Sequence, residues 1–170
     1  MPVYAFKKGM FKIMNYMIFN DVFKSNKELD EMFNNFYPDN EMVKKNKLEL
    51  LVEIGELANE TRYFKYWSNK PMNMDLVCGE YADCIIITLY FFNIMNISLD
   101  EEFSDIDDYD KVDIFARLYK LSSDFYYNDD REIIKEIFVT IIKLGYLIGF
   151  NDQDIIDACM TKININKDKF

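Results

Sequence analysis

Apolar residues recur at intervals of three and four along almost the whole chain, which is the spacing of helices that bury one face. The longest such run, GEYADCIIITLYFFNIMNI at residues 79–97, carries charge only at Glu80 and Asp83. The 170 residues include only 5 Gly and 3 Pro, too few for the many turns of a β architecture. We therefore expect an all-α fold, a helical bundle of about five to six helices in one domain over residues 1–170.

Interruptions of the apolar pattern set the expected helix boundaries. YPDN at 37–40 and SNKP at 68–71 are breaks, and the acidic stretch SLDEEFSDIDDYD at 98–110 indicates a solvated connector without the spacing of a calcium loop. Gly149 is expected to end one helix, and Asn151 with Asp154 to begin the last. The expected helices cover residues 3–23, 27–36, 41–63, 74–96, 111–126, 131–147 and 153–163.

The composition excludes several classes of function. A formal net charge of -10 disfavours nucleic acid as a partner, because nucleic-acid binding depends on Lys and Arg that neutralise phosphates. A nucleotide is still a possible ligand if divalent metal ions separate its phosphates from the acidic protein. The chain has no histidine, which excludes Ser-His-Asp and Cys-His catalysis and most zinc enzymes.

The cysteines and the N-terminal sequence bear on location. Cys78, Cys84 and Cys159 fit no zinc motif, and we expect them to be core residues in a reducing compartment. The first residues lack the pattern of a secretory signal. The longest charge-free run, 84–98, is shorter than the roughly 20 residues that span a bilayer. These features predict a soluble, cytoplasmic protein with no membrane association.

Four glutamates share one stripe of the helix expected at 41–63. At about 100° per residue, they lie within roughly 60° of one another. This pattern alone is most typical of a solvated acidic face. The stripe consists of Glu49, Glu53, Glu56 and Glu60.

The acids of the next helix lie among apolar neighbours instead. Leu76, Val77 and Cys84 surround Glu80 and Asp83 on the helical wheel. The two acids could cap the helix start or form ion pairs with Lys or Arg of another helix. In the functional interpretation, both helices pack as an antiparallel hairpin and their carboxylates meet.

Such a hairpin would bring Glu53 and Glu56 opposite Glu80 and Asp83. Ligand sets made only of oxygen suit hard cations, and Mg²⁺ is the natural choice because it keeps positions open for water and phosphate. A ferritin-like di-iron site would need Glu-x-x-His on two helices, which this chain lacks. The sequence therefore predicts a magnesium site between these two helices.

The segments ELLVEIGELANETRYFKYWSNKP (49–71) and GEYADC (79–84) resemble the all-α nucleoside triphosphate pyrophosphatase superfamily, whose hallmark is Glu-x-x-Glu followed by Glu-x-x-Asp. Within it, the chain is most similar to the dimeric dUTPase branch rather than the shorter MazG-like branch. The resemblance implies a homodimer that hydrolyses dUTP to the monophosphate and pyrophosphate. It implies Mg²⁺ held by Glu53, Glu56, Glu80 and Asp83, with Glu56, and Glu53 beside it, activating the attacking water.

The resemblance also implies substrate contacts. Lys65, Trp67 and Lys70 match a Lys- and Trp-bearing segment of the family that neutralises phosphate and closes over the nucleotide. The alternative for Trp67 is a core or edge aromatic. We expect Arg62, in the same segment, to be a surface residue.

At the C-terminal side, Lys162 and Asn166 resemble a Lys-x-x-x-Asn pattern of the family, followed here by Lys169 in place of Arg. The terminal tyrosine usual in the family is missing, because Phe170 is the last residue of the sequence. A disordered basic tail is the alternative for this segment.

Two departures concern the base. Asn20 matches an asparagine that helps read the pyrimidine and sugar, but Tyr16 stands where the family tends to have Gln. Ile85, Ile86 and Ile87 replace the Leu-His-Phe that often follows the second motif. These departures weaken uracil specificity without affecting the metal site. The alternatives are a MazG-like pyrophosphatase for another or modified nucleotide, and a non-catalytic helical interaction protein on the same fold.

Overall fold

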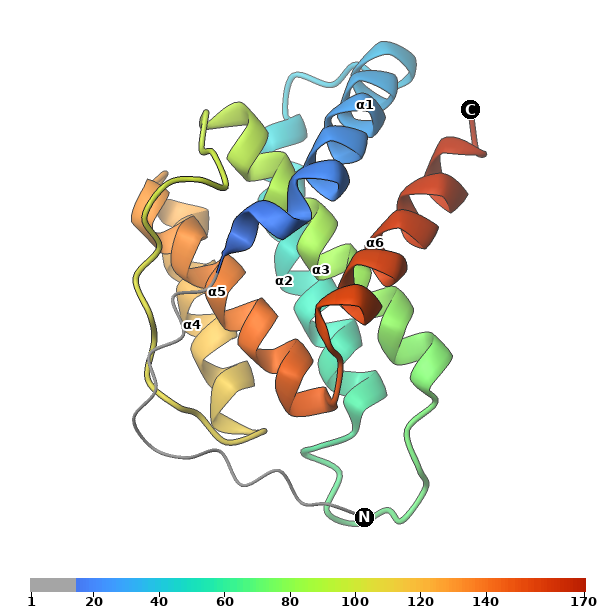
Figure 1. Ribbon diagram of the computed structural model, residues 1–170, viewed down its shortest axis with the longest axis vertical. Coiled ribbons are helices and arrows are strands. Elements are labelled where there is room, and N and C mark those ends of the chain that lie inside the picture. Colours follow the sequence, from blue (N-terminus) through green and yellow to red (C-terminus); the bar gives the residue numbers. More distant parts are fainter. Residues whose placement is uncertain (1–14) are drawn as a thin grey trace.

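The computed structural model describes residues 15–170, and these contain helices and no strand. The predicted all-α fold is confirmed (Figure 1). A short 3-10 helix, Tyr16–Phe19, precedes six α-helices: α1 (Asn20–Phe36), α2 (Met42–Thr61), α3 (Met74–Ile94), α4 (Asp113–Tyr127), α5 (Arg131–Ile148) and α6 (Asp152–Lys167).

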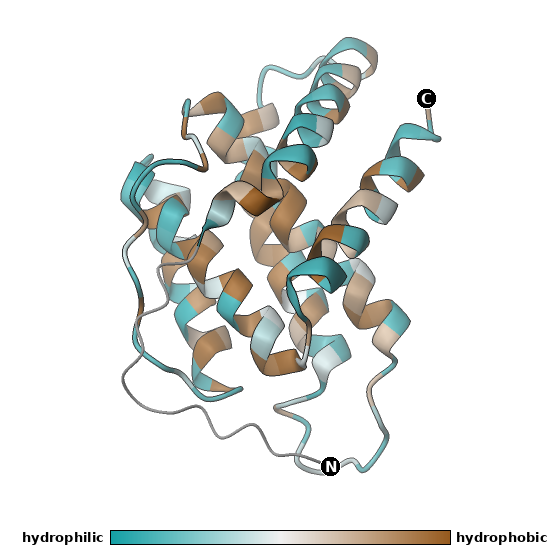
Figure 2. Cartoon of the chain, in the orientation of Figure 1, coloured by the Kyte–Doolittle hydropathy of each residue, from teal (hydrophilic) through white to brown (hydrophobic). Residues whose placement is uncertain are grey.

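Helix α3 is the centre of the bundle, because α1, α2, α5 and α6 all contact it. Hydrophobic residues concentrate on the middle helices, whereas α1 and α6 carry many hydrophilic residues (Figure 2). Helix α3 is the one helix among residues 15–170 with the length and hydropathy of a membrane span. The rest of the protein buries 61% of that apolar window, as in the core helix of a helical bundle.

Local capping explains where several helices begin and end. The Asn73 side chain accepts a hydrogen bond from Asp75 N at the start of α3, and Asp130 caps α5 in the same way. Asn151 and Asp154 form a reciprocal capping box at the start of α6, as predicted. Gly149 ends α5 with φ of 117°, a left-handed conformation that glycine adopts without a steric penalty.

The predicted break between residues 23 and 27 is wrong. Helix α1 runs without interruption from Asn20 to Phe36 and buries Val22, Phe23, Asn26, Leu29 and Asp30 along one face. The polar residues Asn26 and Asp30 on that face interrupt the apolar periodicity of the sequence. Most of the helix predicted at 3–23 lies outside the described residues.

The acidic connector at 98–110 has no helix, as expected, but it is not simply solvated. Arg131 Nη2 of α5 contacts Glu101 Oε1 at 2.9 Å, and Lys143 Nζ contacts Asp105 Oδ1 at 2.7 Å. The ring of Phe103 stacks among core aromatics, 4.8 Å from the Tyr16 ring centroid. Basic side chains of α5 and one aromatic anchor therefore hold the connector on the bundle.

Gly145 of α5 provides a stability test. A Cβ there would overlap the Tyr81 hydroxyl and lie 2.7 Å from Tyr81 Cζ, while this hydroxyl donates to Ile141 O at 3.0 Å. We expect Gly145→Ala to lower the free energy of unfolding by about 1–3 kcal/mol through overpacking. Gly79→Ala is the control, because a Cβ at this position meets nothing within 4 Å. Its free energy of unfolding should rise by about 0.5–1 kcal/mol, since alanine favours a helix more than glycine does. Urea denaturation measures both, and equal effects would contradict the packing described here.

Candidate functional site

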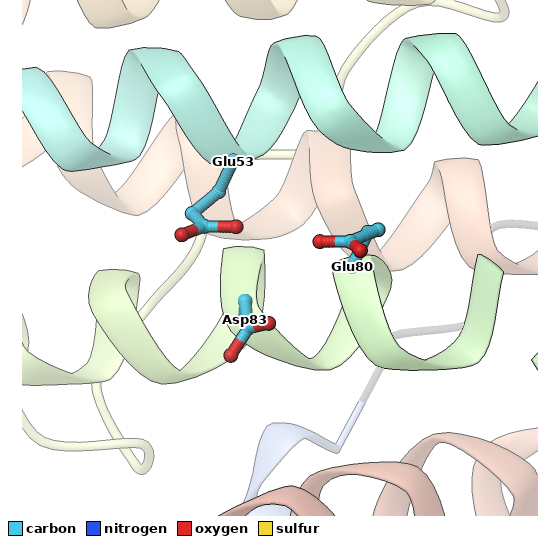
Figure 3. A group of neighbouring side chains, drawn as sticks. All are labelled: Glu53, Glu80 and Asp83. Atoms are coloured by element: carbon cyan, nitrogen blue, oxygen red, sulfur yellow. The ribbon is translucent and has the colours of Figure 1, made fainter. Parts of the chain in front are cut away.

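Three carboxylates meet between α2 and α3. Glu53 of α2 lies opposite Glu80 and Asp83 of α3, and one oxygen of each lies within 4.8 Å of the other two (Figure 3). Glu80 and Asp83 are one turn apart, so both side chains leave the same side of α3. We call Glu53, Glu80 and Asp83 the acidic trio.

The trio is partly withdrawn from water without enough positive charge to balance it. Burial, and then the charges of Asp83 and other neighbouring acids, raise the pKa of Glu53 to about 8. Burial is also the largest cause of the raised pKa values of Glu80 and Asp83. Glu53 Oε2 is buried and has no hydrogen-bond partner among residues 15–170. The fold thus keeps an unsatisfied acceptor facing two other carboxylates.

Among residues 15–170, Lys162 of α6 forms an ion pair with a member of the trio. Its Nζ lies 2.5 Å from Asp83 Oδ2. Burial opposes the charge on Lys162, but the hydrogen bond and charge of Asp83 raise the pKa of this lysine overall. The expectation that Asp83 could pair with a basic residue is therefore met. Glu53 and Glu80 form no salt bridge with any residue of the described range 15–170.

The capping interpretation of Glu80 and Asp83 is wrong. Helix α3 begins at Met74 with Asn73 as its cap, so both acids lie inside the helix, beyond its first turn. They are held in place by buried neighbours such as Tyr81, Ala82 and Cys84 rather than by free backbone N–H groups.

Glu56 stands beside the trio and is not one of its members. Its side chain is exposed, and with Glu80 it lines an open groove of about 470 Å³ along α2. The charge of Glu56 adds to burial in raising the pKa of Glu80. The other lining residues are Val52, Gly55, Asn59 and Glu60.

The donor set of the trio fits a hard divalent cation. Three carboxylates offer oxygen ligands from two helices, and Glu53 Oε2 is an acceptor without a partner in the described part of the chain. A cation would remove the mutual repulsion that raises these pKa values. Oxygen-only ligands exclude the thiolate and imidazole chemistry of zinc sites.

The half-buried Arg62 fastens the loop between α2 and α3. Arg62 ends α2 with φ of 61°, its Nε donates to Lys70 O at 3.0 Å and its Nη2 to Ser68 Oγ at 2.6 Å. Lys65 Nζ turns back to Asn59, which lines the groove, and donates to its Oδ1 at 2.5 Å. Lys70 itself is exposed.

Trp67 lies on the same loop and is not a core residue, because 65% of it is exposed. Its ring packs edge-on against the neighbouring rings of Phe64 and Tyr66. The loop that joins α2 to α3 therefore presents an aromatic surface to solvent.

Asn20 is exposed at the start of α1, whereas Tyr16 is buried 5.4 Å from the Phe138 ring centroid. Asn166 is half-buried on α6 and accepts from Lys169 Nζ at 2.7 Å. The alternative of a disordered tail is wrong: α6 continues to Lys167, and the Phe170 ring packs edge-on against Phe33, with ring centroids 4.9 Å apart.

Asn26 is a residue near the site that the sequence did not predict. It is fully buried on α1 and donates from Nδ2 to Ile86 O of α3 at 3.3 Å. Ile86 lies one turn beyond Asp83. The signal available in the sequence was the spacing of Asn26 and Asp30 on a face shared with Val22 and Leu29. The supposed break at residues 23–27 concealed it.

Comparison with known proteins places this arrangement in context. A family model described as dUTPase matches residues 18–169, which include the trio, the loop and Lys162. No curated protein matches the chain. Enzymes of the dUTPase type generally use a divalent metal, in agreement with the donor set described above.

The raised pKa of Glu53 predicts how the metal-free protein responds to pH. The folded state keeps a proton on Glu53 up to about pH 8, whereas the unfolded chain loses it near its ordinary pKa of 4.5. The stabilisation by this proton is complete below pH 4.5 and is lost as the pH rises to about 8. In EDTA, Glu53→Gln should lose less stability across this range than the parent protein.

Thermal unfolding at several pH values measures this difference. Glu132→Gln is the control, because that side chain is 72% exposed on α5. If the melting temperatures of Glu53→Gln and of the parent protein changed with pH in parallel, the pKa of Glu53 would not be raised in the folded protein.

Proposed function

Because this chain belongs to the dUTPase family, we propose that it is a Mg²⁺-dependent hydrolase that converts dUTP to dUMP and pyrophosphate. The observation that carries the proposal is the acidic trio, whose three carboxylates face one another across α2 and α3. The family match supports a nucleotide pyrophosphatase in general. That dUTP is the preferred substrate is the more specific claim that we propose.

Glu53, Glu80 and Asp83 would hold the Mg²⁺, with Glu56 at the edge of the site. Bound Mg²⁺ supplies positive charge that offsets the phosphate charges of the substrate. Glu56 is suited to orient or deprotonate the attacking water, because it is exposed to the groove while Glu53 is withdrawn. Attack at the α-phosphate then breaks the α–β bond, and pyrophosphate leaves.

Cationic and aromatic side chains would complete the substrate site. Lys162 already lies at Asp83 and is suited to neutralise phosphate charge. Lys65, Trp67 and Lys70 lie on the loop fastened by Arg62, where Trp67 could cover a nucleotide. Asn20 and Asn166 are the further contacts that we propose, on α1 and α6.

We also propose a homodimer, located in the cytoplasm and without nucleic-acid or membrane partners. Leu48 and Val52, one turn apart on α2, expose 56% and 47% of their surfaces, and such an apolar pair suits contact with a second copy. The cysteines are free, in keeping with a reducing compartment. One continuous core among the described residues supports a single domain over 1–170.

A second candidate is a MazG-like pyrophosphatase for another or modified nucleotide. The observation that favours it is Tyr16, which is buried among Phe103 and Phe138 and offers no amide to a base. Substrate preference separates the two candidates.

Pyrophosphate release from a panel of nucleoside triphosphates, with Mg²⁺ or with EDTA, tests the proposal. We expect Mg²⁺-dependent turnover with dUTP preferred. Preference for another triphosphate would favour the second candidate. No turnover of any nucleotide would refute hydrolysis and leave a helical interaction protein on this fold.

Glu53→Gln and Asp83→Asn should each lower kcat by at least about 100-fold, because each removes a charged ligand of the proposed Mg²⁺ site. Asp124→Asn is the control, since it changes only an exposed pair with Lys120 on α4. Circular dichroism should show the same helix content in all three variants. Full activity of Glu53→Gln would disprove the assigned site.

A further inference from the structure

The C-terminal end of α6 and the residues that follow it lie beyond the core anchors of this helix. Ile163 is fully buried, whereas none of residues 164–170 is buried within the described range 15–170. The backbone still continues in tight turns, and Phe170 N donates to Lys167 O at 3.2 Å. We call residues 164–170 the C-terminal segment. Contacts at the surface of the bundle must hold it in place.

Phe170 packs against aromatic side chains at the C-terminal end of α1. Its ring centroid lies 4.9 Å from that of Phe33, in edge-on geometry, and 5.1 Å from that of Phe36. The ring centroid of Tyr37 is 5.7 Å away. Phe36 and Tyr37 are 60% and 62% exposed, so this group of rings lies at the surface. We call Phe33, Phe36, Tyr37 and Phe170 the terminal aromatic cluster.

An ion pair also joins the C-terminal segment to α1. Lys167 Nζ lies 2.8 Å from Glu28 Oε2, and Phe33 and Phe170 follow this pair along their chains, so α1 and α6 run side by side in the same direction here (Figure 1). The Glu28 side chain is 55% exposed, and exposed ion pairs add little stability. Aromatic pairs attract one another beyond the area that they bury. We therefore expect the terminal aromatic cluster to be the stronger link.

The C-terminal segment extends the side of α6 from which Lys162 reaches the trio. Asn166 and Lys169 follow Lys162 by four and seven positions, which are one and two turns of a helix. Lys169 Nζ donates to Asn166 Oδ1 at 2.7 Å. Burial raises the pKa of Asp83 most strongly, whereas the hydrogen bond and charge of Lys162, and then the charge of Lys169, lower it. Lys169 is therefore a second cation on the side of α6 that faces the acids.

We infer that Phe170 is a positioning residue for substrate binding, because its packing on α1 holds the Lys169 ammonium group where it can offset the charge of a bound polyphosphate. Lys169 immediately precedes Phe170, so a fixed Phe170 ring restricts the backbone from which the Lys169 side chain leaves. Without the ring contact the segment would fray, and the ammonium group would spend less time near the phosphates. This inference rests on the proposed function, since Lys169 acts on phosphates only when the trio binds them.

Amide hydrogen exchange of the ligand-free protein tests whether the cluster holds the segment. Phe33→Ala removes a ring of α1 without changing the C-terminal segment itself, and exchange at residues 166–170 should become at least about fivefold faster. Phe170→Tyr keeps a ring and should leave exchange unchanged. Tyr127→Ala is the matched control, because it removes an aromatic side chain that is 80% exposed at the end of α4. Unchanged exchange in Phe33→Ala would overturn the inference.

Steady-state kinetics with Mg²⁺ and dUTP, or the triphosphate that the parent protein prefers, test the role of Lys169. Phe33→Ala, Phe170→Ala and Lys169→Ala should each raise KM roughly 3- to 10-fold and change kcat less than about twofold, because phosphate charge is present both in the bound substrate and in the transition state. Phe170→Tyr should keep the KM of the parent protein. In a Lys169→Ala background, Phe33→Ala should raise KM no further, because both changes remove the same interaction.

A double variant in which the two increases of KM multiply would overturn the inference, because Phe33 and Phe170 would then act through something other than Lys169. A lower kcat with an unchanged KM in Phe33→Ala would overturn it as well. In both cases the proposed hydrolysis would stand. A parent protein that turns over no nucleotide would refute the proposed function, and the role of Phe170 in substrate binding with it.

Discussion

Desolvation of carboxylates between α2 and α3 is the constraint on which the rest of the site depends. Leu50, Ile54 and Leu57 of α2 are fully buried on either side of Glu53, so the helix cannot rotate to return Glu53 to water. On α3, Ala82 and Cys84 fix Asp83 in the same way. The core therefore determines that the acids face one another, at an electrostatic cost that a bound cation would offset.

Helix α6 connects this electrostatic balance to the other end of the bundle. Lys162 reaches Asp83 because Cys159 and Ile163, which flank it on α6, are fully buried. Beyond the end of α6, the Phe170 ring packs against aromatic rings of α1 and the loop that follows α1. Its centroid lies 4.9 Å from that of Phe33, in edge-on geometry, and 5.7 Å from that of Tyr37. Helix α6 therefore carries the Lys162 ammonium group at one position and aromatic packing against α1 at its C-terminal end.

Much of this arrangement could be predicted because it is local. The helices around the acids, the capping box at Asn151 and the left-handed Gly149 follow from residues within a few positions of one another. The continuity of α1 could not, because Asn26 and Asp30 look like interruptions until α3 supplies their hydrogen-bond partners. The hydrogen bonds of Arg62 could not be predicted for a similar reason, because only the path of the loop brings Ser68 and Lys70 near it.

The sequence by itself determined that this chain is helical, which faces of its helices are apolar, and that two helices each carry a pair of acids one turn apart. Such properties depend on helical periodicity, which is a property of neighbouring residues. Only the tertiary structure decided that Glu53, Glu80 and Asp83 converge while Glu56 stays in the groove, and that Lys162 is their counter-charge. Convergence depends on the rotation and register of packed helices, which the whole core sets through contacts between residues distant in the chain.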